Sequence, residues 1–269
     1  MILIGEKING AIPSAAAAIQ TRDEAFIRNL AIAQTNAGAS YLDVCAGTDP
    51  KNELETMRWL VELIQDTVET PLCIDSPNPE ILKEIFPLVK RPGILNSVSG
   101  EGSKCEILYP LLQGNEWNVI ALTCDNHGIP YDAAQKVRIA DELITKADSY
   151  GIAPDRIFVD PLVMALSAVN NSLLVFADAV RGIKQAHPGV KITSGLSNIS
   201  FGLPCRKAVN LNFLTMAMFC GMDSAILDPT NRETITTVLA SEALLGRDKY
   251  CRGYANAYRK GLIGPVKKQ

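Results

Sequence analysis

The stretch PLCIDSPNPE, residues 71–80, shows the pattern that decides the fold. A short apolar run ends on a carboxylate, Asp75, and a turn with two prolines follows at once. Apolar runs of this length, bounded by turn residues, are typical of strands buried in a parallel sheet. Aspartate is also a common turn and helix-capping residue, so a single ending of this kind would carry little weight. The ending matters because it recurs along the chain.

Eight such runs alternate with segments of helical periodicity. The predicted strands lie in ILIGE, AGASYLDVCAG, PLCID, GILNS, WNVIALTCD, IFVDPL, VKITSGLSN and SAILDPT. The predicted helices lie near 22–37, 52–66, 79–87, 103–113, 131–150, 171–186, 207–220 and 231–245. Eight repeats without a long linker predict an α/β fold, a (β/α)8 TIM barrel that forms a single domain over residues 1–269. An open Rossmann sheet is the alternative, but no G-x-G-x-x-G follows the first strand.

Composition and charge exclude several classes of function. Of the 269 residues 47% are hydrophobic, enough for a substantial core, and the net charge of -3 offers no basic surface for nucleic acid. No window approaches about 18 uninterrupted apolar residues and the first residues lack a signal-peptide pattern, which predicts a cytoplasmic protein without membrane association. The 7 cysteines are scattered without a C-x-x-C pair and there are only 2 histidines, so we predict no protein-bound metal.

Each predicted strand ends on a carboxylate or an amide. The last residue or two of the eight strands are Glu6, Asp43, Asp75, Asn96, Asp125 or Asn126, Asp160, Asn198 and Asp228. In a closed parallel barrel these ends converge on one rim, where such enzymes place their chemistry. Asp75 and Asp160 are the strongest candidates, because each directly follows an apolar strand and precedes a proline that would hold the loop rigid.

A purely structural explanation competes at each of these positions. Any one of the residues could cap the next helix or close a turn, and for a single position this explanation is as good as ligand binding. It is the better one for Asp228, which begins the cap-like DPTN, and for Asp125 and Asn126, which lie in the turn-like CDNHGIP.

The residue types indicate the kind of ligand that such a rim would bind. A carboxylate can accept two parallel N–H bonds, while an asparagine amide supplies both a donor and an acceptor. A 2-amino-4-oxo pyrimidine edge, as in a pterin, fits that combination. Sugars and amino acids also bind such rims, so the residue types alone leave these ligands open.

Five ordered motifs resemble those of a known family, the methyltetrahydrofolate:corrinoid methyltransferases. They are LIGEKING at 3–10, LCIDS at 72–76, ILNSVS at 94–99, VDPL at 159–162, and GLSNIS at 195–200, which is followed by Arg206 and FLTMAM at 213–218. The resemblance implies a pterin-binding barrel related to dihydropteroate synthase and usually homodimeric. It also implies transfer of a methyl group between N5 of tetrahydrofolate and the cobalt of a corrinoid, cobalamin, carried by a separate corrinoid-binding protein.

The same resemblance assigns roles to individual residues. Asp75, Asn96 and Asp160 would bind the pterin ring, Asn198 would lie near N5, and Arg206 near the aminobenzoyl-glutamate part of folate. Asn198 and Asp160 are the predicted catalytic residues, and the folate pocket would also include Glu6, Asp43, Gly195 and Ser197. A neutral amide at Asn198 can hydrogen-bond N5 without trapping either the methylated or the unmethylated form.

Some positions depart from the family pattern and leave alternatives open. Cys45 stands where relatives often carry an amide, and Phe201 follows the GLSNIS motif where a polar residue is expected. The corrinoid partner and the direction of transfer therefore stay open. Dihydropteroate synthase is an alternative, although its N-V-T-P-D-S-F loop and S-R-K are missing. A non-catalytic folate-binding protein is another, and a Schiff-base aldolase would have to use Lys7.

Overall fold

Strands and helices alternate along the whole of the computed structural model, which describes residues 1–265. The strands are β1 (Ile2–Asn9), β2 (Tyr41–Cys45), β3 (Leu72–Asp75), β4 (Ile94–Gly100), β5 (Asn118–Asp125), β6 (Ile157–Asp160), β7 (Lys191–Ile192) and β8 (Ser224–Leu227). The α-helices are α1 (Pro13–Thr21), α2 (Glu24–Asn36), α3 (Pro50–Gln65), α4 (Pro79–Ile85), α5 (Lys104–Leu108), α6 (Ala133–Ser149), α7 (Ser172–Ala186), α8 (Arg206–Cys220), α9 (Arg232–Leu244) and α10 (Arg252–Arg259). The last four residues of the predicted domain, 266–269, lie outside the described residues.

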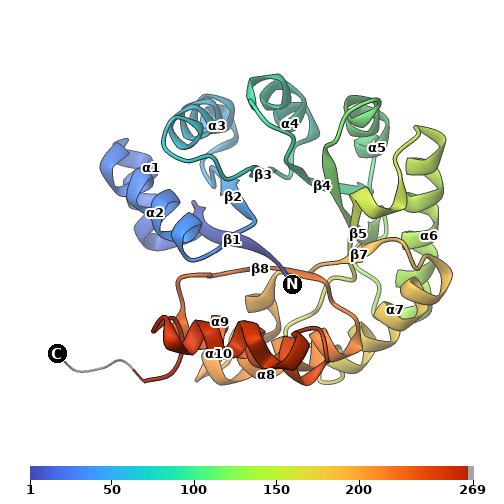
Figure 1. Cartoon of the computed structure of the whole chain (residues 1–269). Helices are drawn as coiled ribbons and strands as arrows, with labels where there is room; N and C mark the ends of the chain where they lie inside the picture. The colour runs from blue at the N-terminus through green and yellow to red at the C-terminus, as the bar shows by residue number, and fades with distance from the viewer. Residues whose placement is uncertain (266–269) are drawn as a thin grey trace.

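The strands form a closed parallel barrel. They pair in the order β7-β6-β5-β4-β3-β2-β1-β8. The barrel is closed by an isolated parallel bridge between Gly195, in the segment after β7, and Ile226 of β8, with the Ile226 N–H donating to the Ser194 carbonyl oxygen at 3.0 Å. Figure 1 shows the helices as a ring outside the strands, which confirms the predicted (β/α)8 fold. Within residues 1–265 no helix combines the length and apolar composition needed to cross a bilayer.

Along each strand, one side chain faces the inside of the barrel and the next faces the surrounding helices. The inside holds an apolar cluster of its own, formed by Ile4, Cys73, Ile94, Ile120 and Phe158, with Ile2, Tyr41, Leu122 and Ile226 packed against it. The intervening strand residues, such as Leu42, Ile74 and Leu95, belong to the larger core between strands and helices. Because the barrel interior is filled, a ligand can enter only at an end.

Among the register shifts toward the carboxyl end of the barrel, two are bulges of one extra residue. Strand β1 carries one residue more than β2 between Gly5 and Ile8, and β4 carries one more than β5 just after Asn96. Gln34 of α2 is fully buried and its Oε1 accepts the Lys7 N–H at 3.0 Å, which satisfies the backbone of the first bulge. Bulges redirect side chains, and they are common beside active sites for that reason.

Several element boundaries differ from the prediction. The helices α1 and α10 were not predicted, because α1 is a short alanine-rich segment and α10 lies in a tail of mixed composition. The predicted helix 103–113 is α5 followed by a 3-10 helix, η2 (Tyr109–Leu112). Pro110 has no N–H to donate back along an α-helix, so the chain tightens there.

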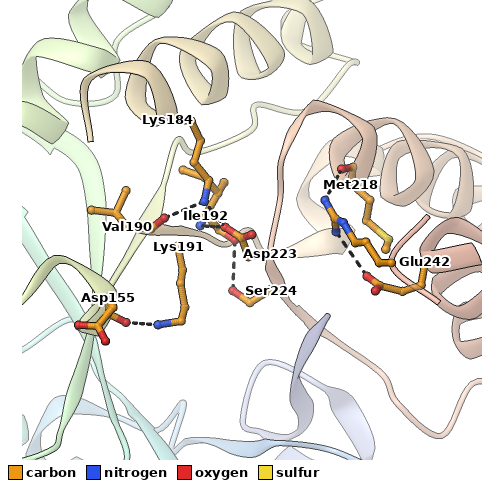
Figure 2. A network of polar contacts seen from close by, with 10 residues as sticks. Asp155, Lys184, Val190, Lys191, Ile192, Met218, Asp223, Ser224 and Glu242 are labelled. Atoms are coloured by element: carbon orange, nitrogen blue, oxygen red, sulfur yellow. Dashed lines mark hydrogen bonds and ion pairs between the residues drawn. The ribbon is translucent and has the colours of Figure 1, made fainter. Parts of the chain in front are cut away.

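A polar network joins β7 and β8 at the amino end of the barrel (Figure 2). The Lys184 ammonium of α7 donates to the Val190 carbonyl oxygen at 2.7 Å and to Asp223 Oδ2 at 2.6 Å. The same carboxylate oxygen accepts the Ile192 N–H at 2.9 Å. These bonds reinforce a junction where the two-residue strand β7 offers few ladder bonds.

Candidate active site

A polar layer follows the inner apolar cluster at the carboxyl end of the barrel. Because the side-chain period of a strand is two, the residue two places beyond each inward-facing apolar residue also faces inward. These residues are Glu6 after Ile4, Asp43 after Tyr41, Asp75 after Cys73, Asn96 after Ile94, Asp160 after Phe158 and Asp228 after Ile226. The alternation therefore places a ring of carboxyl and amide groups on top of the apolar plug.

Five of the predicted strand-end residues do not end strands, among them Asp228, which follows the last residue of β8. Glu6, Asp43 and Asn96 lie within β1, β2 and β4, because these strands continue beyond them, through a bulge in β1 and β4. Asn198 lies beyond β7, in the 3-10 helix η4 (Leu196–Ser200). Inward orientation, and not position at the last residue of a strand, is what the ring members share.

Asp43 is the most deeply buried member of the ring, and the half-buried Asp75 lies beside it on the neighbouring strand. Burial raises the pKa of Asp43 well above its usual value, and the neighbouring Asp75 carboxyl raises it further. Asn96 Nδ2 donates to Asp43 Oδ1 at 3.3 Å. Burial also raises the pKa of Asp75 to about 6, although a hydrogen bond from the Cys45 thiol opposes this rise. Two carboxyl groups this close share protons readily near neutral pH.

Asp160 is the second anchor of the ring and is only 5% exposed. Its Oδ1 accepts the Leu162 N–H at 2.7 Å. Burial raises the pKa of Asp160 to about 6, while the N–H groups of Leu162 and Gly195 and the Lys136 ammonium act in the opposite direction. The loop after β6 thus folds back on the carboxylate and fixes its orientation.

Glu6 interacts electrostatically with charged residues that follow β7 and β8, Arg206 and Asp228. Burial raises its pKa to about 7 and the Asp228 carboxylate adds to the rise, while Lys7 and Arg206 lower it. The Lys7 ammonium lies 3.4 Å from Asp228 Oδ2. Glu6 therefore titrates in the physiological range among charges of both signs.

Asn198 lies exposed at the mouth, beside Gly195. A Cβ atom on Gly195 would lie 2.9 Å from Asn198 Nδ2, so the amide folds back over this glycine. Arg206, exposed at the start of α8, donates from Nη2 to the Ser197 carbonyl oxygen at 2.8 Å and from Nε to Ser200 Oγ at 3.0 Å. Arg206 thereby links α8 to η4, the 3-10 helix that carries Asn198.

Asp125 and Asp228 close turns, as the structural explanation predicted for them, while Asn126 joins its turn to the loop after β4. Asp125 Oδ1 accepts the exposed His127 N–H at 2.8 Å, and Asn126 Oδ1 accepts the Gly102 N–H at 2.9 Å. Asp228 Oδ1 accepts the Thr230 N–H at 2.9 Å. Asp228 nevertheless adds to the field at Glu6, so it has both a structural and an electrostatic effect.

Two buried charged residues near the ring were missed in the sequence. Glu53 of α3 accepts the Ser76 hydroxyl at 2.5 Å and its charge raises the pKa of Asp75. Lys136 of α6 is 1% exposed and binds the loop that follows Asp160. Both occupy the apolar stripe of their helices, Glu53 with Met57 and Leu60. A charged residue on an otherwise buried stripe is the signal that could have found them.

The arrangement suits a neutral, flat ligand with several N–H donors. Ionised Asp75 and Asp160 can accept such donors, and Asn96 can both donate and accept. Within residues 1–265 no cluster of three or more histidine, cysteine or acidic side chains is arranged to hold a metal ion. That the chain binds no metal stays a prediction.

Comparison with known proteins agrees with this geometry. A family described as "Pterin binding enzyme" matches residues 8–228, a range that contains every member of the ring except Glu6. The chain belongs to this family of pterin binding enzymes. A methylcorrinoid:tetrahydrofolate methyltransferase from Eubacterium limosum is 54% identical over 268 residues, which cover 99% of this chain and 99% of that protein. The resemblance that the motifs indicated is confirmed.

More distant relatives share the domain within longer proteins. Methionine synthase from Mycobacterium leprae is 30% identical over 206 residues, which cover 72% of this chain but 17% of that protein. Methionine synthase from Mycobacterium tuberculosis is 29% identical over 240 residues, which cover 84% of this chain and 20% of that protein. In these larger enzymes a segment of the chain's size is one part of the whole.

Solved structures support the fold. A dihydropteroate synthase from Xanthomonas albilineans, solved with 4-aminobenzoic acid, aligns with a TM-score of 0.69 over 91% of this chain and 93% of that chain, at 18% identity. A dihydropteroate synthase from Yersinia pestis aligns with a TM-score of 0.65 over 91% of this chain and 94% of that chain, at 16% identity. At this identity the likeness concerns the barrel and carries no argument about the reaction.

Proposed function

We propose that this protein transfers a methyl group from a methylated corrinoid, held by a separate protein, to N5 of tetrahydrofolate. The observation that carries the proposal is the ring of buried and half-buried carboxyl and amide groups at the barrel mouth, in a chain that is 54% identical over 268 residues to a methylcorrinoid:tetrahydrofolate methyltransferase. The name of that relative supports the direction of transfer, which the motifs alone left open.

The ring binds the pterin head. Asp75 and Asp160 accept hydrogen bonds from the amino group and the ring N–H groups, while Asn96 serves an edge that both donates and accepts. Because the pKa values of the two aspartates are about 6, they are largely ionised above neutral pH. Gly195 and Ser197 leave room at the rim, and Arg206 faces the anionic tail of folate.

Asn198 acts at the reacting nitrogen. The methylated corrinoid would supply the methyl group as its substrate: the free electron pair of N5 would bond to the methyl carbon, cobalt would keep the electron pair of the broken cobalt–carbon bond, and the N5 proton would pass to solvent. A carboxylic acid at this position would risk protonating N5, whereas the amide can hydrogen-bond N5 before and after transfer without releasing a proton. Its exposed position in η4 leaves it beside a substrate that enters from the mouth.

The alternatives receive less support. Lys7 would have to be an unpaired amine to form a Schiff base, but its ammonium lies 3.4 Å from the Asp228 carboxylate. The dihydropteroate synthases match at 16% and 18% identity, far below the 54% of the methyltransferase. Only an activity assay can distinguish the proposed methyltransferase from a protein that binds folate without catalysing a reaction.

The test follows the visible spectrum of methylcobalamin mixed with the protein and tetrahydrofolate, with loss of the methyl–cobalt band as the signal. We expect Asp75→Ala to weaken tetrahydrofolate binding by about 1–3 kcal/mol, the usual effect of leaving buried donors unpaired. Asn198→Ala should lower turnover more than affinity, while Asn256→Ala on the exposed side of α10 serves as the matched control. Binding of tetrahydrofolate without demethylation, with a cognate corrinoid protein present, would support the non-catalytic alternative.

We also propose that the protein forms a homodimer through helices α7, α8 and α9. Large apolar side chains are exposed there together: Leu174, Met216, Phe219 and Leu244, with exposed fractions of 64%, 51%, 75% and 81%. They line a groove of about 540 Å³. Exposed apolar surface of this kind marks interfaces, and an isologous contact would cover the patch with a second copy of itself. Light scattering should report a dimer for the wild type and a monomer for Phe219→Glu.

A further inference from the structure

A buried lysine lies directly behind Asp160. Lys136 of α6 is 1% exposed, and its ammonium donates to the Pro161 carbonyl oxygen at 2.6 Å and to the Leu162 carbonyl oxygen at 2.8 Å. Lysine is rarely buried to this degree without a partner, because removing the ammonium from water is unfavourable. Here the partners are two backbone carbonyls of one loop, and no part of the proposed reaction has used this residue.

A single peptide group connects Lys136 with Asp160. The carbonyl oxygen of the Pro161–Leu162 peptide accepts from Lys136 Nζ, and the N–H of the same peptide donates to Asp160 Oδ1 at 2.7 Å. The peptide dipole thus points its negative end at the ammonium and its positive end at the carboxylate. Leu162 has a φ of 53°, the left-handed region, so the loop holds a conformation that a leucine rarely adopts.

We propose that Lys136 is a positioning residue that holds the Pro161–Leu162 peptide against Asp160, and thereby keeps that carboxylate ionised and aimed at the pterin head. The inference rests on the proposed function, because it deepens the role of the same site. Lys136 does not touch the substrate, and it acts through the loop and through its charge.

The charges around the pair set a pH range for binding. Burial lowers the pKa of Lys136 to about 8, against the effect of Asp160, Cys124 and Asp132. The pKa of Asp160 is about 6. Carboxylate and ammonium are therefore both charged mainly between these values. Tetrahydrofolate binding should be strongest in this window. It should weaken below it as Asp160 and Asp75, whose pKa is also about 6, are protonated, and weaken above it as Lys136 loses its proton.

The chain offers a matched control for the test. Lys184 of α7 also donates to a backbone carbonyl, that of Val190, and lies close to a carboxylate, that of Asp223, but it does so at the amino end of the barrel (Figure 2). Lys184→Met should lower stability without moving the pH dependence of folate binding. Lys136→Met should lower stability and also change that dependence.

The experiment measures tetrahydrofolate affinity by calorimetry between pH 5 and 9 for the wild type, Lys136→Met, Lys136→Arg and Lys184→Met. Removing a nearby opposite charge typically raises a carboxyl pKa by about one unit. In the pH profile of affinity, the acid limb is the loss of binding at low pH and the alkaline limb is the loss at high pH. We expect Lys136→Met to move the acid limb to higher pH by about one unit and to remove the alkaline limb. Lys136→Arg should restore the acid limb, and it should lack the alkaline limb because guanidinium stays charged.

The outcomes separate the inference from the function on which it rests. A wild-type protein that does not bind tetrahydrofolate would overturn the proposed function. A wild-type protein that binds, with Lys136→Met following the same pH profile as Lys184→Met, would overturn the role of Lys136 alone. Should Lys136→Met fail to fold, Lys136→Gln, which keeps a donor without the charge, must show the same upward shift of the acid limb.

Discussion

Replacing Asp160 by asparagine should make the ligand-free protein more stable at alkaline pH and remove most of its folate binding. Asparagine has the shape of aspartate, and its Oδ1 can still accept the Leu162 N–H. It carries no charge, so the unfavourable burial of a carboxylate disappears. The same substitution is thus expected to raise stability and to lower ligand binding, which is common for groups arranged to bind a ligand.

The magnitude follows from the pKa of Asp160. Its rise from 3.8 to about 6 means that the ionised form is disfavoured in the folded state by at most about 3 kcal/mol. The raised pKa contributes stability that is fully present below the unfolded value near 3.8 and is lost as the pH rises through 6. The variant also leaves Lys136 without its facing carboxylate, so we expect a net gain of about 1–2 kcal/mol at pH 8 and almost none at pH 4.

Urea denaturation without ligand at pH 4, 6 and 8 measures this difference, with Asp148→Asn, a change at an exposed aspartate of α6, as the control. The free energy of unfolding of Asp160→Asn, relative to the wild type, should increase with pH, while that of the control should stay constant. A variant less stable than the wild type at pH 8, or a difference that does not depend on pH, would refute the reasoning. Calorimetry should show folate affinity lowered by about 1–3 kcal/mol.

Three further predictions concern other parts of the site. Gly195→Ala should lower turnover in the same manner as Asn198→Ala, because its Cβ would meet Asn198 Nδ2 at 2.9 Å; steady-state kinetics at saturating folate test this, and unchanged turnover would contradict it. Gln34→Leu should lower the free energy of unfolding by about 1–3 kcal/mol by leaving the Lys7 N–H unpaired, as urea titration would measure. Thiol titration at pH 8 should detect the exposed Cys205 and Cys251 first and Cys45 late, because burial and the Asp75 and Asp43 carboxylates raise the pKa of Cys45; a Cys45→Ser variant that loses a fast-reacting thiol would contradict this.

The sequence by itself determined the barrel and the chemical type of its mouth. Eight apolar runs with helical segments between them leave few arrangements that bury both faces of a parallel sheet, so local patterns are sufficient for the fold. Asp75 and Asp160 could be identified because each ends its strand directly before a proline turn. The ordered motifs then indicated the family.

The tertiary structure alone decided which polar groups meet and in which protonation state. Glu6 and Asn96 lie inside strands with bulges, and a bulge depends on how neighbouring strands pair, which a local pattern does not encode. Lys136 reaches a carbonyl 25 residues along the chain because α6 packs on the loop after β6. Burial sets the pKa values of the ring, and burial is a property of the closed barrel that no single segment possesses.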